Sequence, residues 1–180
     1  MQRRDPERLH ERHGRAVMLY VGLSVIGVLV ALIAMNRRNV SAGMNMPIQY
    51  DDFAFSVLGS RQVPDAPGVG PGLVELVVTL KINNRARRVS FGFQDDWAVL
   101  CDKDGVEYHV SQRLQRAFEA EHGRGNPTAR PLPARTAVTK ELVFEVPAAL
   151  RSPRLKIKMG GPVGEVLGTV LFGRKTFQLP

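Results

Sequence analysis

The chain has 180 residues, of which 44% are hydrophobic and 23% charged, so it can bury a core and is not a disordered chain. Its net charge of +8 divides evenly: residues 1–43 hold seven basic and three acidic residues, and residues 44–180 hold eighteen and fourteen. Because half of the charge flanks an apolar segment and the rest is spread over a domain, we do not expect nucleic-acid binding. The single cysteine, Cys101, excludes an internal disulfide and a cysteine-based zinc site.

A segment near the N-terminus, 16–35, contains no charged side chain. A helix rises about 1.5 Å per residue, so the segment matches the roughly 30 Å hydrocarbon layer of a bilayer and predicts one transmembrane helix. More arginines precede the segment than follow it, which predicts a cytoplasmic tail over 1–15 and places 36–180 on the other side. The arginines are Arg3, Arg4, Arg8, Arg12 and Arg15 before it, and Arg37 and Arg38 after it.

Two features of this segment leave alternatives open. Val40-Ser41-Ala42 fits the small-residue site of a cleaved secretory signal, but the apolar core is longer than the about 7–15 residues of such signals, so we favour an uncleaved anchor. Gly27 and Ala31 form a small-xxx-small pair, which is compatible with a helix-mediated homodimer. No cysteine follows the segment directly, so a lipoprotein anchor is excluded.

After a polar tether predicted over 36–47, the sequence predicts one domain over 48–180. Alternating apolar residues indicate short strands, the first of them kinked near Asp51-Asp52. The predicted strands cover 50–57, 73–83, 89–93, 97–101, 106–110, 136–146, 155–159, 166–172 and 176–179. Residues 64–72 contain three prolines and three glycines and predict a loop, and Asp102-Lys-Asp-Gly105 predicts a tight hairpin turn.

One segment has helical rather than strand periodicity. Leu114, Ala117 and Phe118 lie at i, i+3 and i+4, with Ser111 as N-cap and Gly123 as a stop, so a short amphipathic helix over 111–122 is expected to pack on a sheet. The glycine- and proline-containing stretch that follows, up to residue 135, is predicted to be a mobile linker.

These elements predict an all-β fold: an antiparallel β-sandwich with a short inserted helix, preceded by one N-terminal transmembrane helix. The alternation is typical of antiparallel sheets with one solvated face. In the strand 136–146, Leu142, Phe144 and Val146 are expected to face the core. Val143 on the opposite face indicates partial cover by the helix.

The order of motifs resembles a known family. The pattern consists of Val77-Val-Thr-Leu-Lys-Ile-Asn-Asn84, then Asp102-Lys-Asp-Gly105 with Tyr108, then Leu142-Val-Phe-Glu-Val-Pro147. It is similar to that of bacterial immunoglobulin-like domains of unknown function. These occur in envelope lipoproteins and membrane-anchored proteins and look related in fold to secreted mycobacterial immunoprotective antigens. The resemblance covers about 48–180 and implies an immunoglobulin-like sandwich. It carries no catalytic residues, and this chain departs from it by its helix and by an arginine-rich turn.

Two charged clusters are candidate sites. Calcium takes six to eight oxygen ligands, and five acidic residues surround one hairpin, although their spacing is not that of an EF-hand and a capped turn is the simpler interpretation. These are Asp95, Asp96, Asp102, Asp104 and Glu107. Three arginines are candidate contacts for anionic headgroups, polysaccharide or an acidic partner, with a solvated turn as the simpler interpretation. These are Arg85, Arg87 and Arg88.

Patterns typical of enzymes are absent from the sequence: there is no Gly-x-Ser-x-Gly, and the histidines lack the spacing of metal ligands. We therefore predict no catalysis and no cofactor. The favoured function is a module in the plasma membrane, with its C-terminal domain periplasmic or extracellular, that binds an envelope protein through an exposed sheet edge or loop, strand addition being a natural mode. The alternative is a ligand- or calcium-binding sensor.

Overall fold

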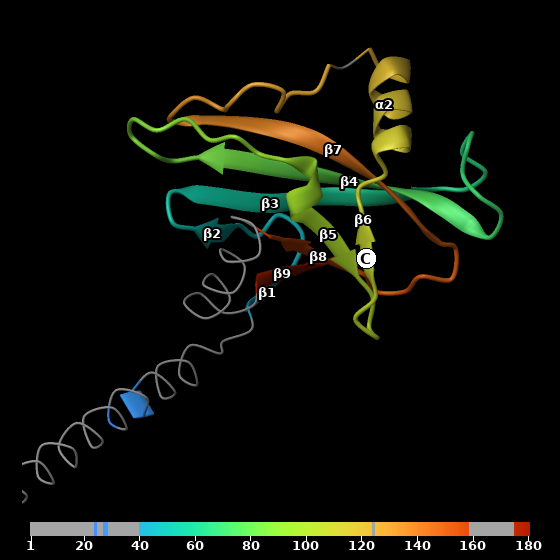
Figure 1. Cartoon of the computed structure of the whole chain (residues 1–180), viewed down its shortest axis with the longest axis horizontal. Coiled ribbons are helices and arrows are strands. Elements are labelled where there is room, and N and C mark those ends of the chain that lie inside the picture. The colour runs from blue at the N-terminus through green and yellow to red at the C-terminus, as the bar shows by residue number, and fades with distance from the viewer. Residues whose placement is uncertain (1–23, 25–26, 29–39, 124, 159–174) are drawn as a thin grey trace, which may run out of the picture.

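The computed structural model of the chain describes residues 24, 27–28, 40–123, 125–158 and 175–180. From residue 40 onward, the described residues fold into a sandwich of two sheets (Figure 1). One sheet has the strand order β1-β9-β8-β5-β6 and the other β2-β3-β4-β7. The elements are β1 Val40–Ala42, β2 Ile48–Tyr50, β3 Phe53–Val63, β4 Leu73–Asn84, the 3-10 helix η1 Asp95–Trp97, β5 Ala98–Cys101, β6 Glu107–His109, α2 Gln112–Glu121, β7 Thr136–Pro147, β8 Arg154–Ile157 and β9 Lys175–Gln178.

The four-stranded sheet is built from long strands. Alternate residues of β4 are apolar and buried in the interior, as predicted: Val74, Leu76, Val78, Leu80 and Ile82. β4 pairs antiparallel with β3 on one side and with the whole of β7 on the other. Leu142, Phe144 and Val146 of β7 are fully buried, so the predicted core face of this strand is confirmed.

The five-stranded sheet contains shorter strands and one parallel pair. β5 and β6 form the predicted hairpin, and its turn places Gly105 at φ 87°, a conformation that glycine adopts without strain. β1 pairs parallel with β9, the exception among otherwise antiparallel described strands. The sandwich therefore begins at Val40, before the predicted boundary at 48, because β9 satisfies backbone groups that a free tether leaves to water.

Aromatic residues fill one end of the interior. Phe53 stacks on Phe91 with ring centroids 4.0 Å apart, and Phe91 lies 6.0 Å from Trp97. The prediction of a strand over 89–93 is wrong, because Phe91 makes only an isolated bridge, to Leu132. Burial of the aromatic rings, rather than strand pairing, explains the alternation that suggested a strand there.

The predicted helix is confirmed as α2. The Ser111 hydroxyl accepts from the Leu114 N–H, which makes Ser111 the N-cap, and the chain leaves the helix at Gly123 with φ 58°. Leu114 and Phe118 pack against Val77 and Val143 on the outer face of the four-stranded sheet. The predicted cover of Val143 by the helix is therefore confirmed.

The first predicted strand divides into two. Asp51, with φ 52°, and Asp52 form a tight turn between β2 and β3, so the expected kink is a hairpin. The predicted strand 166–172, and all but three residues of the predicted span 16–35, lie outside the described residues. Within the part of the chain that the structure describes, no helix has the length and apolar character needed to cross a membrane.

Candidate functional site

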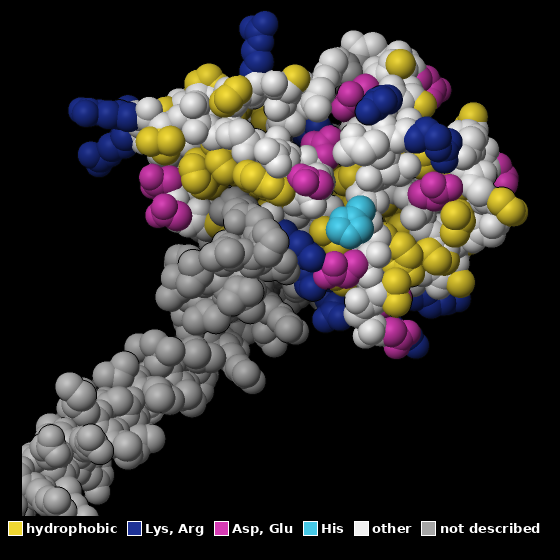
Figure 2. Space-filling model, in the orientation of Figure 1, with side chains coloured by type: hydrophobic (Ala, Val, Ile, Leu, Met, Phe, Trp, Pro, Cys, Tyr) yellow, Lys and Arg dark blue, Asp and Glu magenta, His cyan; other side chains and the backbone are white. Residues whose placement is uncertain are grey.

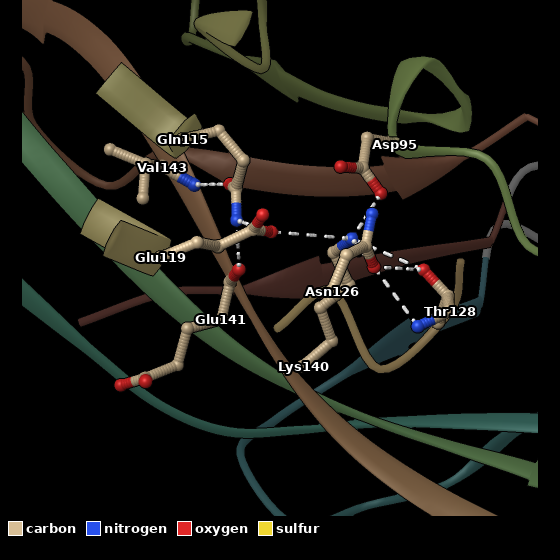
Figure 3. Close-up of polar contacts among 8 residues, drawn as sticks. All are labelled: Asp95, Gln115, Glu119, Asn126, Thr128, Lys140, Glu141 and Val143. Atoms are coloured by element: carbon tan, nitrogen blue, oxygen red, sulfur yellow. Dashed lines mark hydrogen bonds and ion pairs between the residues drawn. The ribbon is translucent and has the colours of Figure 1, made fainter. Parts of the chain in front are cut away.

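A cavity of about 330 Å³ lies among α2, the linker that follows it and the strands β4 and β7. Pockets for small molecules span about 300–1,000 Å³, so this one is at the small end of that range. It is lined by Thr79, Gln115, Phe118, Glu119, Gly125, Pro127, Thr139, Lys140 and Glu141. The polar network around it is drawn in Figure 3.

Lys140 of β7 is the buried cation of this network, with 1% of its surface exposed. Its Nζ lies 2.7 Å from Asp95 Oδ1 and donates to Asn126 Oδ1 at 2.6 Å and Thr128 Oγ1 at 3.1 Å (Figure 3). Glu119 Oε1 is 3.9 Å away. An ammonium has three hydrogens to donate, so the capacity of Lys140 is filled. Its role is to join β7, η1, α2 and the linker.

The sequence held a signal for this lysine. The alternation that places Leu142, Phe144 and Val146 on the core face places Lys140 there too, one step earlier. A lysine on a core face requires compensating oxygens, because a buried unpaired charge is strongly unfavourable. The linker predicted to be mobile supplies two of them and is therefore anchored to the sheet at this point.

Gln115 of α2 closes the outer edge of β7. Its Nε2 donates to the carbonyl of Glu141 and its Oε1 accepts from the Val143 N–H, both at 2.9 Å. The side-chain amide thus makes the two hydrogen bonds that a neighbouring strand would make. The Ser111 N–H donates to the Val143 carbonyl at 2.9 Å and extends the closure. Gln115 is 3% exposed, and no sequence pattern signals this role.

The outer side of β3 is much less covered. β2 pairs with β3 only at Phe53–Phe55, and the Asn45 N–H donates to the Val57 carbonyl at 2.7 Å. Over Leu58–Val63, no other described strand pairs with the side of β3 that faces away from β4. We call this side of Leu58–Val63 the open edge.

The sheet register identifies the backbone groups that point out of the open edge. Val143 directs its N–H and C=O away from β4, and Val77, in register with it, therefore directs its own toward β3. Arg61 is in register with Val77 and so bonds to β4. Its neighbours Ser60 and Gln62 must then point their N–H and C=O groups away from β4.

Apolar side chains lie beside the open edge. Leu58 is 38% exposed, and the bond from Asn45 to Val57 brings the loop with Met44 and Met46 alongside. Met44 is 43% and Met46 60% exposed. Exposed methionines are common at surfaces that accommodate varied partners, because the side chain is flexible and polarisable.

The structure does not gather the five acidic calcium candidates. Asp95 is bound to Lys140, whereas Asp96 is exposed on η1. Asp102 Oδ1 accepts from the Asp104 N–H at 2.9 Å, a local bond that shapes the hairpin turn.

Glu107 at the other end of the hairpin binds two lysines, one in β8 and one directly after it. It accepts from Lys158 at 2.8 Å and Lys156 at 3.3 Å, and the hydrogen bond from Lys158 is the main cause that lowers the pKa of Glu107. Cys101 is buried beside it, and burial raises the pKa of its thiol. Across the described ranges, no three His, Cys, Asp or Glu side chains come together in a group able to hold a metal ion.

The three candidate arginines do come together, in a turn after β4 that we call the basic turn (residues 85–88). Asn84 holds it: its Oδ1 accepts from the Ala86 N–H at 3.0 Å, and its Nδ2 donates to the Val89 carbonyl at 2.8 Å. Asn84 is fully buried. Arg87 and Arg88 are exposed, and Figure 2 shows basic side chains projecting from the end of the molecule where Figure 1 places β2.

Comparisons with known proteins identify the fold. No family model and no curated protein matches the chain. The secreted protein MPT63 of Mycobacterium tuberculosis matches with a TM-score of 0.50 at 15% identity, over 68% of this chain and 92% of its own. The Bacillus subtilis yjhA protein matches at 0.50 and 14%, over 77% and 99%. An uncharacterised β-sandwich protein of Clostridium difficile matches at 0.51 and 10%, over 80% and 96%.

These likenesses concern the fold alone, because the identities are low. They support an immunoglobulin-like β-sandwich, and the expected likeness to a secreted mycobacterial protein is confirmed at the level of architecture. A shared sandwich does not transfer a function, since such folds carry many.

Proposed function

We propose that this protein is a membrane-anchored extracytoplasmic module that binds an envelope protein by strand addition at the open edge. The observation that carries the proposal is the contrast within one sheet. Gln115 and Ser111 bind the outward carbonyl of Glu141 and both outward backbone groups of Val143 in β7, whereas those of Ser60 and Gln62 in β3 have no described strand beside them.

Strand addition suits this edge physically. Main-chain hydrogen bonds supply affinity, and side chains next to the added strand supply selectivity. At this edge Leu58, Met44 and Met46 offer exposed apolar surface for that second role. An extended partner segment with apolar residues at alternate positions is the expected ligand.

Photo-crosslinking in living cells tests this binding mode. A photoreactive residue replaces Gln62 at the open edge or, as control, the exposed Gln112 on α2. We expect a discrete adduct from position 62 alone, and its loss when Ser60→Pro is added, because proline removes an outward N–H. Equal adducts from both positions, or an adduct indifferent to the proline, would contradict strand addition.

The anchoring is supported by the uncharged segment 16–35 and by the arginines before it. Protease treatment of intact spheroplasts tests it. We expect residues 40–180 to be degraded in intact spheroplasts while a cytoplasmic marker survives. A domain that resists the protease until the membrane is opened would overturn the proposed location.

A second candidate, a ligand-binding sensor, is favoured by the cavity beside Lys140. Replacing Thr79 by Trp would fill that cavity from β4. If the cavity holds a ligand, metabolite extracts raise the melting temperature of the wild-type chain and leave Thr79→Trp unchanged. Equal shifts in both chains would remove the cavity from consideration.

A further inference from the structure

We propose that the basic turn faces the membrane in which the chain is anchored and contacts anionic lipid headgroups. This inference rests on the anchoring proposed above and adds an orientation of the domain to it. It begins from β1, which the sequence placed in a tether and the structure places in the sandwich.

The position of β1 shortens the connection to the membrane. The predicted span ends at Met35 and β1 begins at Val40, so only residues 36–39 lie between them, instead of 36–47. At 3.3–3.6 Å per residue the five steps from Met35 to Val40 reach at most about 17 Å. The end of the sandwich that carries Val40 must therefore lie close to the headgroups.

A chain of contacts places the basic turn at that same end. Val40 is in register with Lys175 of β9. The Lys175 ammonium donates to the Gln49 carbonyl and lies 4.6 Å from the centre of the Tyr50 ring. The Gln49 side chain in turn accepts from Arg85 Nη1 at 3.1 Å. β1, β9, β2 and the basic turn are thus neighbours.

The charge at this end is mostly positive. Arg135 precedes Thr136, which is in register with Asn84 at the base of the basic turn. The basic residues there are Arg85, Arg87, Arg88, Arg135 and Lys175, and the acidic ones are Asp51 and Asp52 in the turn between β2 and β3, with Asp96 on η1, which leads into Ala98. Each basic residue beside an anionic surface strengthens binding about fivefold, an effect that fades within about 10 Å at 0.1 M salt.

The opposite end offers a control surface far from the bilayer. β4 has twelve residues, so at about 3.3 Å per residue its ends are separated by roughly 40 Å. The turn between β5 and β6 lies at the far end, because Cys101 is in register with Arg154 at the start of β8, whereas Ala98 is in register with Ile157, at the end of β8 that lies toward Lys175. Val106, 51% exposed, marks that far end.

Depth measurement on the full chain in nanodiscs tests the orientation. A fluorophore is attached at Ser90→Cys beside the basic turn or at Val106→Cys, with the buried Cys101 replaced by Ala in both. Nanodiscs contain phosphatidylcholine alone or with phosphatidylglycerol, plus a headgroup quencher. We expect quenching at position 90 but little at 106, and an increase at 90 on adding phosphatidylglycerol that is lost in high salt.

Charge reversal then assigns the contact. Arg87→Glu with Arg88→Glu removes two contacts, so the ratio of docked to undocked domain should fall by at least about 25-fold. The matched control, Lys103→Glu with Arg151→Glu, makes the same charge change on exposed residues of the far end and should leave quenching unaltered. Equal quenching at both labels, or equal effects of both reversals, would overturn the orientation.

The same experiment tests the anchoring separately, by co-elution of the chain with nanodiscs. If the chain does not co-elute with nanodiscs after a high-salt wash, the proposed anchor fails. If it co-elutes but position 90 is no more quenched than position 106, the anchor stands and the membrane-facing basic turn alone is refuted.

Discussion

Two edges of the four-stranded sheet, that of β7 and that of β3, are covered to very different extents. At β7, a helix is folded over the edge and the amide of Gln115 takes up the backbone groups of Glu141 and Val143. At β3, cover ends near Val57, and the next six residues keep one side free of described strands. In this sheet, side-chain and backbone hydrogen bonds from α2 and Ser111 close the edge of β7, whereas no such element among the described residues closes the edge of β3.

A bare edge carries a hazard, because unpaired N–H and C=O groups invite pairing with other chains. Proteins usually limit that hazard with short strands, charges, bulges or cover. The open edge has a bulge between Val57 and Gly59 and the charge of Arg61, but neither occupies the outward groups of Ser60 and Gln62. An edge with such modest protection is suited to a binding partner, as proposed.

Removing the buried cation of β7, Lys140, should cause the largest loss of stability. Lys140→Met leaves Asp95 without its partner, and breaking a buried ion pair by removing one member costs about 3–5 kcal/mol. Urea unfolding measures the loss. The exposed Lys81→Met on β4 is the control and should change stability by less than about 0.5 kcal/mol. Similar stabilities for the two variants would contradict the role of Lys140 in joining β7, η1, α2 and the linker.

Proline substitutions should distinguish the two sides of β3 itself. Arg61→Pro removes an N–H that bonds to β4 and leaves a carbonyl of β4 without its donor, so it should destabilise the fold by about 1–3 kcal/mol. Gln62→Pro removes an outward N–H and should change stability by less than about 1 kcal/mol, because proline is tolerated at strand edges. Thermal unfolding of the pair decides. Equal losses would mean that the backbone of Gln62 is paired after all.

Opening the closed edge should have an intermediate effect. Gln115→Ala leaves the carbonyl of Glu141 and the N–H of Val143 without the amide, which costs about 1–3 kcal/mol for a buried unsatisfied group. The variant should also gain concentration-dependent association by light scattering. The exposed Gln112→Ala on the same helix should show neither change. A monomeric, fully stable Gln115→Ala would refute the closure.

The smallest effect is expected at Glu75, which lies on β4 between the two edges, in register with Val63 and Glu145. Burial raises the pKa of Glu75, so the folded protein binds its proton more tightly than the unfolded chain and loses stability as pH rises through that pKa. Glu75→Gln should therefore raise the melting temperature slightly at pH 7. The gain should vanish at low pH, where the wild-type carboxyl is protonated, and a constant gain would contradict this cause.

Strand periodicity was sufficient to predict β4 and the core face of β7, because those residues follow a two-residue alternation between solvent and core. The hairpin at Gly105 was predicted from its Asp-Gly turn, because glycine adopts the positive φ that a tight turn requires. Strand periodicity failed at residues 89–93, where buried rings imitate that alternation without a pairing strand. The parallel pairing of β1 with β9 joins residues far apart in sequence, and the three residues of Val40–Ala42 are too few to show a strand alternation. Lys140 was within reach of the alternation, but its oxygen partners come from three separate segments.

Amide hydrogen exchange of the free, full-length protein tests the central contrast most directly. We expect the amides of Ser60 and Gln62 to exchange rapidly, near the rate of an unprotected chain. The amide of Val143, bonded to Gln115, and that of Arg61, bonded to β4, should exchange only when the sheet opens. Protection of Ser60 and Gln62 equal to that of Val143 would contradict the claim that one edge of this sheet is closed and the other open.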